Sequence, residues 1–223
     1  MEHMTTQPPI QPIASAEQSL VCDIATIPNA ISAFGALLVW RGSNHLDTGW
    51  GFGSTLAGRV ADLLDGQIAR KTGQTSDLGA AVDATLDKLA VTKIGWELYD
   101  RDIAPKWFLK AMGALAVTNS LATALAAQQL TETSQRPTTS GKLAMASQNL
   151  ALLSYAGSRL LTKHAVQSER ENGQEPAHRS AKVVRMLGHA AAALGIGLGV
   201  KAAGSYITRA VRARSRSSRP AQE

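Results

Sequence analysis

Four regularly spaced aspartates are the residues of this sequence best suited to chemistry. Asp62 and Asp65 are three residues apart, and Asp83 and Asp87 are four apart, so each pair shares one face if its segment is helical. The linker between the two segments, residues 71–76, holds a glycine and small polar residues that allow two helices to fold back as a hairpin. We therefore expect the four carboxylates to converge on one point.

Carboxylates that meet in low-dielectric surroundings repel one another unless a cation neutralises them. Oxygen ligands without clustered Cys or His favour Mg²⁺ or Mn²⁺ over Zn²⁺, and four carboxylates suffice for two ions that clamp a phosphoryl group. Gly66, Ala69 and Gly79 are small and leave room for a ligand, while Arg70 offers a planar fork for phosphate oxygens. The pattern predicts metal-assisted phosphoryl transfer.

A solvated acidic surface is the ordinary explanation for any one of these aspartates. The explanation fails for the set, because eight fixed positions at this spacing should arise by chance with odds on the order of 10⁻⁸. The five histidines show no ligand spacing, and we assign them no chemistry.

Helices must position these residues, because no alternating apolar pattern typical of strands persists anywhere in the chain. The uncharged run 111–131 covers about 30 Å as a helix, which is the thickness of a bilayer's hydrocarbon core. It predicts a membrane helix, whereas the segment 77–98 carries charges and could span a bilayer only if they faced a protein-lined cavity. Periodicity alone also allows a soluble alanine-rich bundle. The fold class is all-α, with six helices expected at 29–45, 51–71, 77–98, 105–130, 143–163 and 183–211.

Composition bounds the class of protein further. The 223 residues include 23 Lys and Arg against 17 Asp and Glu, a net charge of +6, and a single Cys excludes a disulfide scaffold. Aromatic residues make up only 4%, which argues against a nucleic-acid partner bound by base stacking. We expect a flexible polar segment at 1–22 without a signal peptide, a helical domain at 23–208 and a basic disordered tail at 209–223.

The segment 62–87 resembles the D-x2-D-G-x2-A-R-x8-G-x3-D-x3-D motif of the CDP-alcohol phosphatidyltransferase family, with every fixed position filled. The similarity extends upstream to residues 27–32, which begin Ile27, Pro28 and Asn29, and more weakly downstream to Gly141 and Lys142. The resemblance implies a six-helix transmembrane bundle, commonly a homodimer, integral to the cell membrane with its active site facing the cytosol. It also implies transfer of a phosphatidyl group from CDP-diacylglycerol to a small alcohol acceptor, with release of CMP.

The resemblance further implies a role for each motif residue. Asp62, Asp65, Asp83 and Asp87 would bind two divalent ions, Mg²⁺ or Mn²⁺, and Asp87 would also be the catalytic base that takes the proton of the acceptor hydroxyl. The residues that would line the CDP pocket are Gly66, Ala69, Arg70 and Gly79.

The acceptor alcohol is open between two classes. Lys88 matches the lysine that family members using glycerol phosphate carry after the last aspartate, whereas Thr85 matches the threonine of members that use inositol phosphate. Gly35 stands where glycerol-phosphate users often have arginine. We favour a glycerol-3-phosphate-like acceptor over inositol-1-phosphate and expect Arg136 and Lys142 to hold its phosphate. A non-catalytic membrane homologue and a soluble Mg-dependent hydrolase are the alternatives from other classes.

Overall fold

The computed structural model describes residues 27–72, 77–127, 138–172 and 178–217, and within these residues the chain is helical with no strand. This confirms the all-helical fold expected from the sequence. The six helices are α2 (Ile27–Ser43), α3 (Gly49–Thr72), α4 (Asp77–Asp100), α5 (Lys106–Ala127), α6 (Thr139–Asn172) and α7 (His178–Ser217).

Local capping chemistry explains where several of these helices begin. The Thr48 hydroxyl accepts a hydrogen bond from the Gly51 amide at 3.1 Å, and the Thr138 hydroxyl does the same for Gly141 at 3.1 Å. Both threonines thus satisfy an amide in the first turn that has no partner inside its helix. Pro105 lies directly before α5 and has no backbone N–H, so it adds no unpaired amide at the start of that helix.

The last two helices are longer than the sequence indicated. The segment 163–182 reads as a polar loop, but α6 continues to Asn172 and α7 already begins at His178. The end of α7 at Ser217 also lies inside the segment expected to be a disordered tail. The expected ends of both helices were too early because charged residues suggested a loop. Exposed Arg, Lys and Glu are in fact good helix formers once a helix has started.

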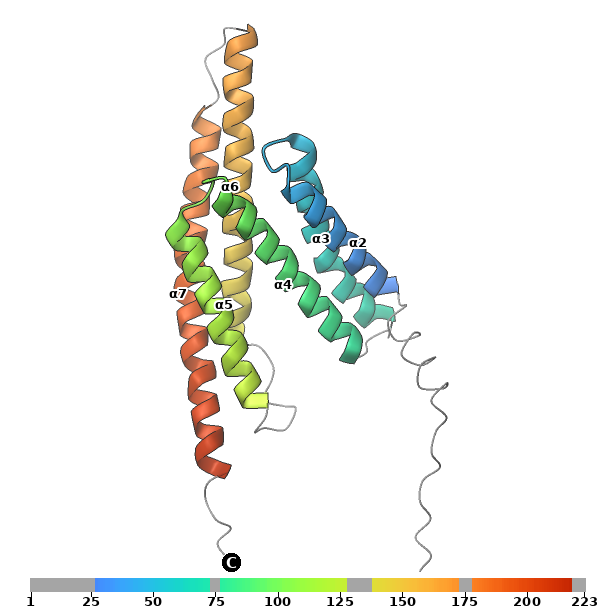
Figure 1. The fold of residues 1–223 in the computed structure, drawn as a ribbon, viewed down its shortest axis with the longest axis vertical. Coiled ribbons are helices and arrows are strands. Elements are labelled where there is room, and N and C mark those ends of the chain that lie inside the picture. Colours follow the sequence, from blue (N-terminus) through green and yellow to red (C-terminus); the bar gives the residue numbers. More distant parts are fainter. Residues whose placement is uncertain (1–26, 73–76, 128–137, 173–177, 218–223) are drawn as a thin grey trace, which may run out of the picture.

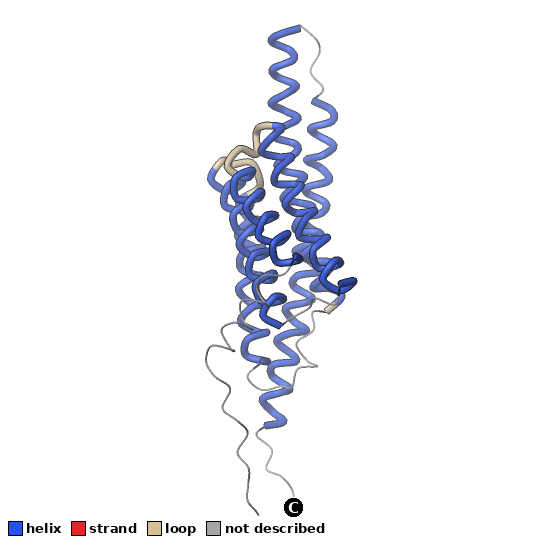
Figure 2. Tube along the Cα trace, turned by 90° about the vertical axis from the view of Figure 1, so that its right-hand side faces the viewer, coloured by secondary structure: helices blue, strands red, loops and turns tan. Residues whose placement is uncertain are grey.

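The helices form an elongated bundle in which α2, α3 and α4 make one group and α5, α6 and α7 another (Figures 1 and 2). The most extensive packing is between α6 and α7, and α5 also packs against α7. Among the described residues α2 packs closely against both α3 and α4, the two helices that carry the acidic residues.

The apolar core joins the end of α4 to residues of α5, α6 and α7, and Val39 of α2 and Leu46 of the α2–α3 loop belong to the same cluster. Leu98, Phe108, Leu152 and Tyr155 have no exposed surface, and the rings of Phe108 and Tyr155 are 5.9 Å apart. The Tyr155 hydroxyl and His189 Nδ1 are 3.0 Å apart, so this buried phenol has a hydrogen-bond partner on α7. The core thus fixes one end of α4 and leaves its acidic beginning at the other end.

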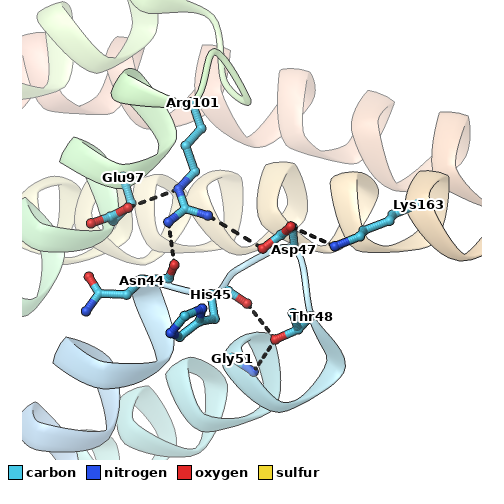
Figure 3. Close-up of polar contacts among 8 residues, drawn as sticks. All are labelled: Asn44, His45, Asp47, Thr48, Gly51, Glu97, Arg101 and Lys163. Carbon is cyan, nitrogen blue, oxygen red and sulfur yellow. Dashed lines mark hydrogen bonds and ion pairs between the residues drawn. The ribbon is translucent and has the colours of Figure 1, made fainter.

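A polar network fastens the α2–α3 loop to the rest of the bundle (Figure 3). Asp47 in this loop pairs with Lys163 of α6 at 2.8 Å and with Arg101, after α4, at 3.5 Å. Arg101 also donates to Glu97 at 3.1 Å and to the Asn44 carbonyl. The Lys163 hydrogen bond is the main cause that lowers the pKa of Asp47 below its usual value of 3.8, while partial burial opposes the shift.

Apolar side chains lie exposed on all six described helices. One large example from each helix is Phe34, Leu56, Trp96, Val117, Leu150 and Met186. By length and hydropathy one described segment, Arg179–Arg209 of α7, qualifies as a membrane span. The uncharged run 111–131, which the sequence predicts as a membrane helix, lies only in part on α5, and its end after Ala127 falls outside the described residues.

Candidate active site

The site is built on a very close crossing of α2 and α3. A Cβ atom added at Gly58 would lie 2.4 Å from the Gly35 carbonyl oxygen, and one added at Gly35 would lie 3.0 Å from the Gly58 carbonyl oxygen. Because neither residue has a side chain, the backbones of the two helices can approach each other closely at this point. Small and polar residues gather around this crossing, among them Ser32, Gly35, Ala36, Gly58, Arg59 and Asp62.

Two of the four predicted metal ligands meet beside this crossing, around one guanidinium group. Arg59 of α3 lies 3.3 Å from Asp62 on its own helix and donates a hydrogen bond to Asp87 of α4 at 2.7 Å. All three side chains are mostly buried, with 10% of Arg59, 19% of Asp62 and 18% of Asp87 exposed. The carboxylates of α3 and α4 thus point toward one position of positive charge.

The fourth partner in this group comes from α6. Asn149 Oδ1 lies 3.4 Å from the Arg59 guanidinium, and Asn149 Nδ2 donates to the Met145 carbonyl oxygen at 3.1 Å. The second bond fixes the orientation of the amide, so that its oxygen faces Arg59. Neither Arg59 nor Asn149 was among the residues expected from the sequence. The spacing of Arg59 three residues before Asp62 was a usable signal, whereas no sequence pattern links Asn149 to the motif.

The remaining acidic residues are placed less completely. Asp83 is partly buried on α4, one helical turn before Asp87 and hence on the same face. Asp65 belongs to α3, but its side chain lies outside the described part of the structure. Among the described side chains no three acidic, His or Cys residues are grouped as a metal would require.

The donor chemistry nevertheless suits a hard cation. Asp62 and Asp87 supply oxygen ligands from two helices, and both already face the same positive group. Mg²⁺ and Mn²⁺ prefer carboxylate oxygens, and partial burial limits screening of their charge. The two described carboxylates therefore fit a divalent ion in chemistry, and the ligand assignments of the quartet stay predictions.

The predicted substrate-contacting residues are only partly visible. Gly79 is buried on α4, as a residue facing a packed site would be. The surroundings of Gly66, Ala69 and Arg70 lie outside what the structure describes, although all three belong to α3. Lys142 is exposed in the first turn of α6, and Arg136 falls outside the described residues.

Comparison with known proteins agrees with the motif. The family model described as CDP-alcohol phosphatidyltransferase matches residues 25–194. A stretch of 91 residues, 39% of this chain, is 32% identical to proteins described as "Putative cardiolipin synthase" from Mycobacterium bovis and Mycobacterium tuberculosis. The match covers 43% of those curated relatives, which is less than half of their length. No solved structure matches the chain.

Proposed function

Because the chain belongs to the CDP-alcohol phosphatidyltransferase family, we propose that it transfers a phosphatidyl group from CDP-diacylglycerol to an alcohol and releases CMP. The convergence of Asp62 and Asp87 on one position of positive charge, within the complete motif, carries this proposal. The membrane family, the exposed apolar side chains and the apolar segment of α7 support an enzyme that meets a lipid donor in the bilayer.

The acidic residues carry the chemistry in this proposal. Asp62, Asp65, Asp83 and Asp87 hold two divalent ions, Mg²⁺ or Mn²⁺. When bound, these ions supply the positive charge that stabilises the diphosphate as CMP leaves. Asp87 accepts the proton of the acceptor hydroxyl, whose oxygen forms the new bond to the phosphatidyl phosphorus while the bond from that phosphorus to CMP breaks.

The glycines and the arginine of the motif position the donor. Gly66, Ala69 and Gly79 leave space for the nucleotide, and Arg70 binds phosphate oxygens through its planar fork. We place the catalytic domain at 23–208 in the membrane, as a six-helix transmembrane bundle with the acidic site facing the cytosol. The family resemblance further favours a homodimer.

The acceptor we favour is glycerol-3-phosphate-like, with Arg136 and Lys142 binding its phosphate. Inositol-1-phosphate is the second candidate, because Thr85, between Asp83 and Asp87, is similar to the threonine that inositol-phosphate users carry there. Phosphatidylglycerol enters as a third candidate, because the curated relatives are named for cardiolipin synthesis.

The test is CMP release by purified full-length protein in detergent micelles with CDP-diacylglycerol. Glycerol-3-phosphate, inositol-1-phosphate, serine and phosphatidylglycerol are supplied separately, with Mg²⁺ or Mn²⁺ and again with EDTA. We expect metal-dependent CMP release with one acceptor. No CMP with any acceptor would favour a non-catalytic homologue or another nucleotide donor, and release that persists in EDTA would remove the metals from the mechanism.

A further inference from the structure

Arg59 is the charged side chain of the site that the proposed chemistry does not use. It is buried, with 8% of the residue exposed, and it bonds to Asp62, Asp87 and Asn149, which come from three different helices. A buried arginine needs compensating partners, and here those partners include two of the proposed metal ligands. The Arg59 guanidinium and the proposed divalent ion would therefore bind the same two carboxylates.

Arginine and a divalent ion cannot share these carboxylates without a cost. With the guanidinium 2.7 Å from Asp87 and 3.3 Å from Asp62, an ion between the carboxylates would lie beside another positive charge in a partly buried place. Like charges at such separations repel strongly where solvent screening is weak. Binding of the ion must therefore loosen at least one contact of Arg59.

We propose that Arg59 is a resident counter-ion that holds Asp62 and Asp87 together without metal and competes with the divalent ion for them. The inference rests on the metal-dependent function proposed above. Arg59 is a positioning residue in this scheme, since it acts through the two aspartates. Asn149 contributes to this role, because its amide oxygen can still accept a hydrogen bond from the Arg59 guanidinium when the two carboxylates bind the metal ion.

Mn²⁺ affinity measured by calorimetry on the full chain in detergent micelles tests this proposal directly. Arg59→Gln removes the competing charge, so we expect Mn²⁺ to bind roughly tenfold more tightly than to the wild type, a coupling of ordinary size. Arg59→Lys keeps the charge but cannot bridge two carboxylates and an amide, so its affinity should fall between the two. Arg41→Gln is the matched control, because it removes the same charge from an exposed position on α2 and should leave the affinity unchanged.

Thermal denaturation gives a second measurement that needs no turnover. In EDTA, Arg59→Gln should unfold at a lower temperature than the wild type, because Asp62 and Asp87 lose their counter-ion. Saturating Mn²⁺ should then raise its unfolding temperature by more than it raises that of the wild type.

The results separate this proposal from the proposed function. Absence of Mn²⁺ binding by the wild type would contradict the function itself. Equal or weaker Mn²⁺ binding by Arg59→Gln would overturn the counter-ion role while leaving the function intact. If Arg59→Gln does not fold, Arg59→Lys decides, since an affinity equal to that of the wild type would overturn the proposal.

Discussion

Asp87 receives the shortest hydrogen bond of the site, 2.7 Å from the Arg59 guanidinium, and comes from a different helix than its partner. A carboxylate held in this way is oriented before any substrate arrives. Metal binding and proton acceptance, its two proposed roles, both need the negative charge of the carboxylate. Asparagine has the same shape and keeps an acceptor oxygen but has no charge, so the substitution tests the charge separately from the hydrogen bond.

Asp87→Asn should lower the rate of CMP release by at least about 10²-fold, the lower end of what a general base contributes. Folding should persist, because the asparagine carbonyl oxygen can still accept from Arg59. CMP release and thermal denaturation, measured on the same preparation, check both statements. Asp100→Asn, at the exposed end of the same helix, should change neither. Wild-type turnover by Asp87→Asn would exclude Asp87 from the mechanism.

At this scale the sequence predicted part of the arrangement of the acidic side chains, while their roles stay predictions. Spacing alone indicated that Asp62 and Asp87 would face one point, and the structure places both against one guanidinium. Asn149 could not be predicted in this way, because it reaches the site through the packing of α6, far away in the chain. Arg59 could have been predicted from helical spacing, but its ion pair with Asp87 depends on how α3 and α4 are placed in the bundle.

Between helices, the crossing of α2 and α3 depends on the absence of a side chain at Gly58. A methyl group there would lie 2.4 Å from the Gly35 carbonyl oxygen and 2.8 Å from Val39 Cγ2. Gly58→Ala should therefore destabilise the protein by about 1–3 kcal/mol, the usual cost of overpacking. Thermal denaturation followed by circular dichroism in micelles measures the loss.

Gly53→Ala is the control for this substitution on the same helix. Gly53 is exposed and has no atom within 4 Å of an added Cβ, so alanine should stabilise α3 by up to about 1 kcal/mol through helix propensity. Equal effects of the two substitutions would show that propensity, and not the close crossing, sets the response.

The loop network predicts a pH dependence that belongs to Asp47. Because the folded pKa of Asp47 is lowered, the stability it contributes is present above its usual pKa of 3.8 and is lost as the pH falls through the folded pKa. Asp47→Asn should therefore reduce stability by up to about 1 kcal/mol at neutral pH. The difference from the wild type should vanish in acid, as denaturation across a pH series would show. A difference that does not depend on pH would contradict an ionic contribution.

Helix type was easier to predict from sequence than helix length. The expected and observed beginnings of α3, α4 and α5 differ little, since Thr48, Asp77 and Pro105 are start signals visible in the sequence. The ends of α6 and the beginning of α7 were misplaced, because charged residues there suggested a loop. The sequence predicted one pairing, the hairpin across residues 71–76, whereas the place of α2 beside both α3 and α4 emerges only from the structure.

The whole molecule presents apolar surface on every described helix, and α7 contains one segment long and apolar enough to span a bilayer. We expect the expressed protein to remain in the membrane pellet after an alkaline carbonate wash and to enter solution only with detergent. The physical reason is that burying this surface in lipid removes it from water. Release by carbonate would favour the soluble bundle that periodicity alone allows.

The packing of α5 against α7 has a consequence for how the chain matures. Helices α2, α3 and α4 are neighbours in sequence and in space, so this group can assemble while the rest is still being synthesised. Helix α5 emerges next, but the helix it packs against, α7, is synthesised only after all of α6. The acidic half can therefore be in place early, whereas the other half must wait until α7 has been made.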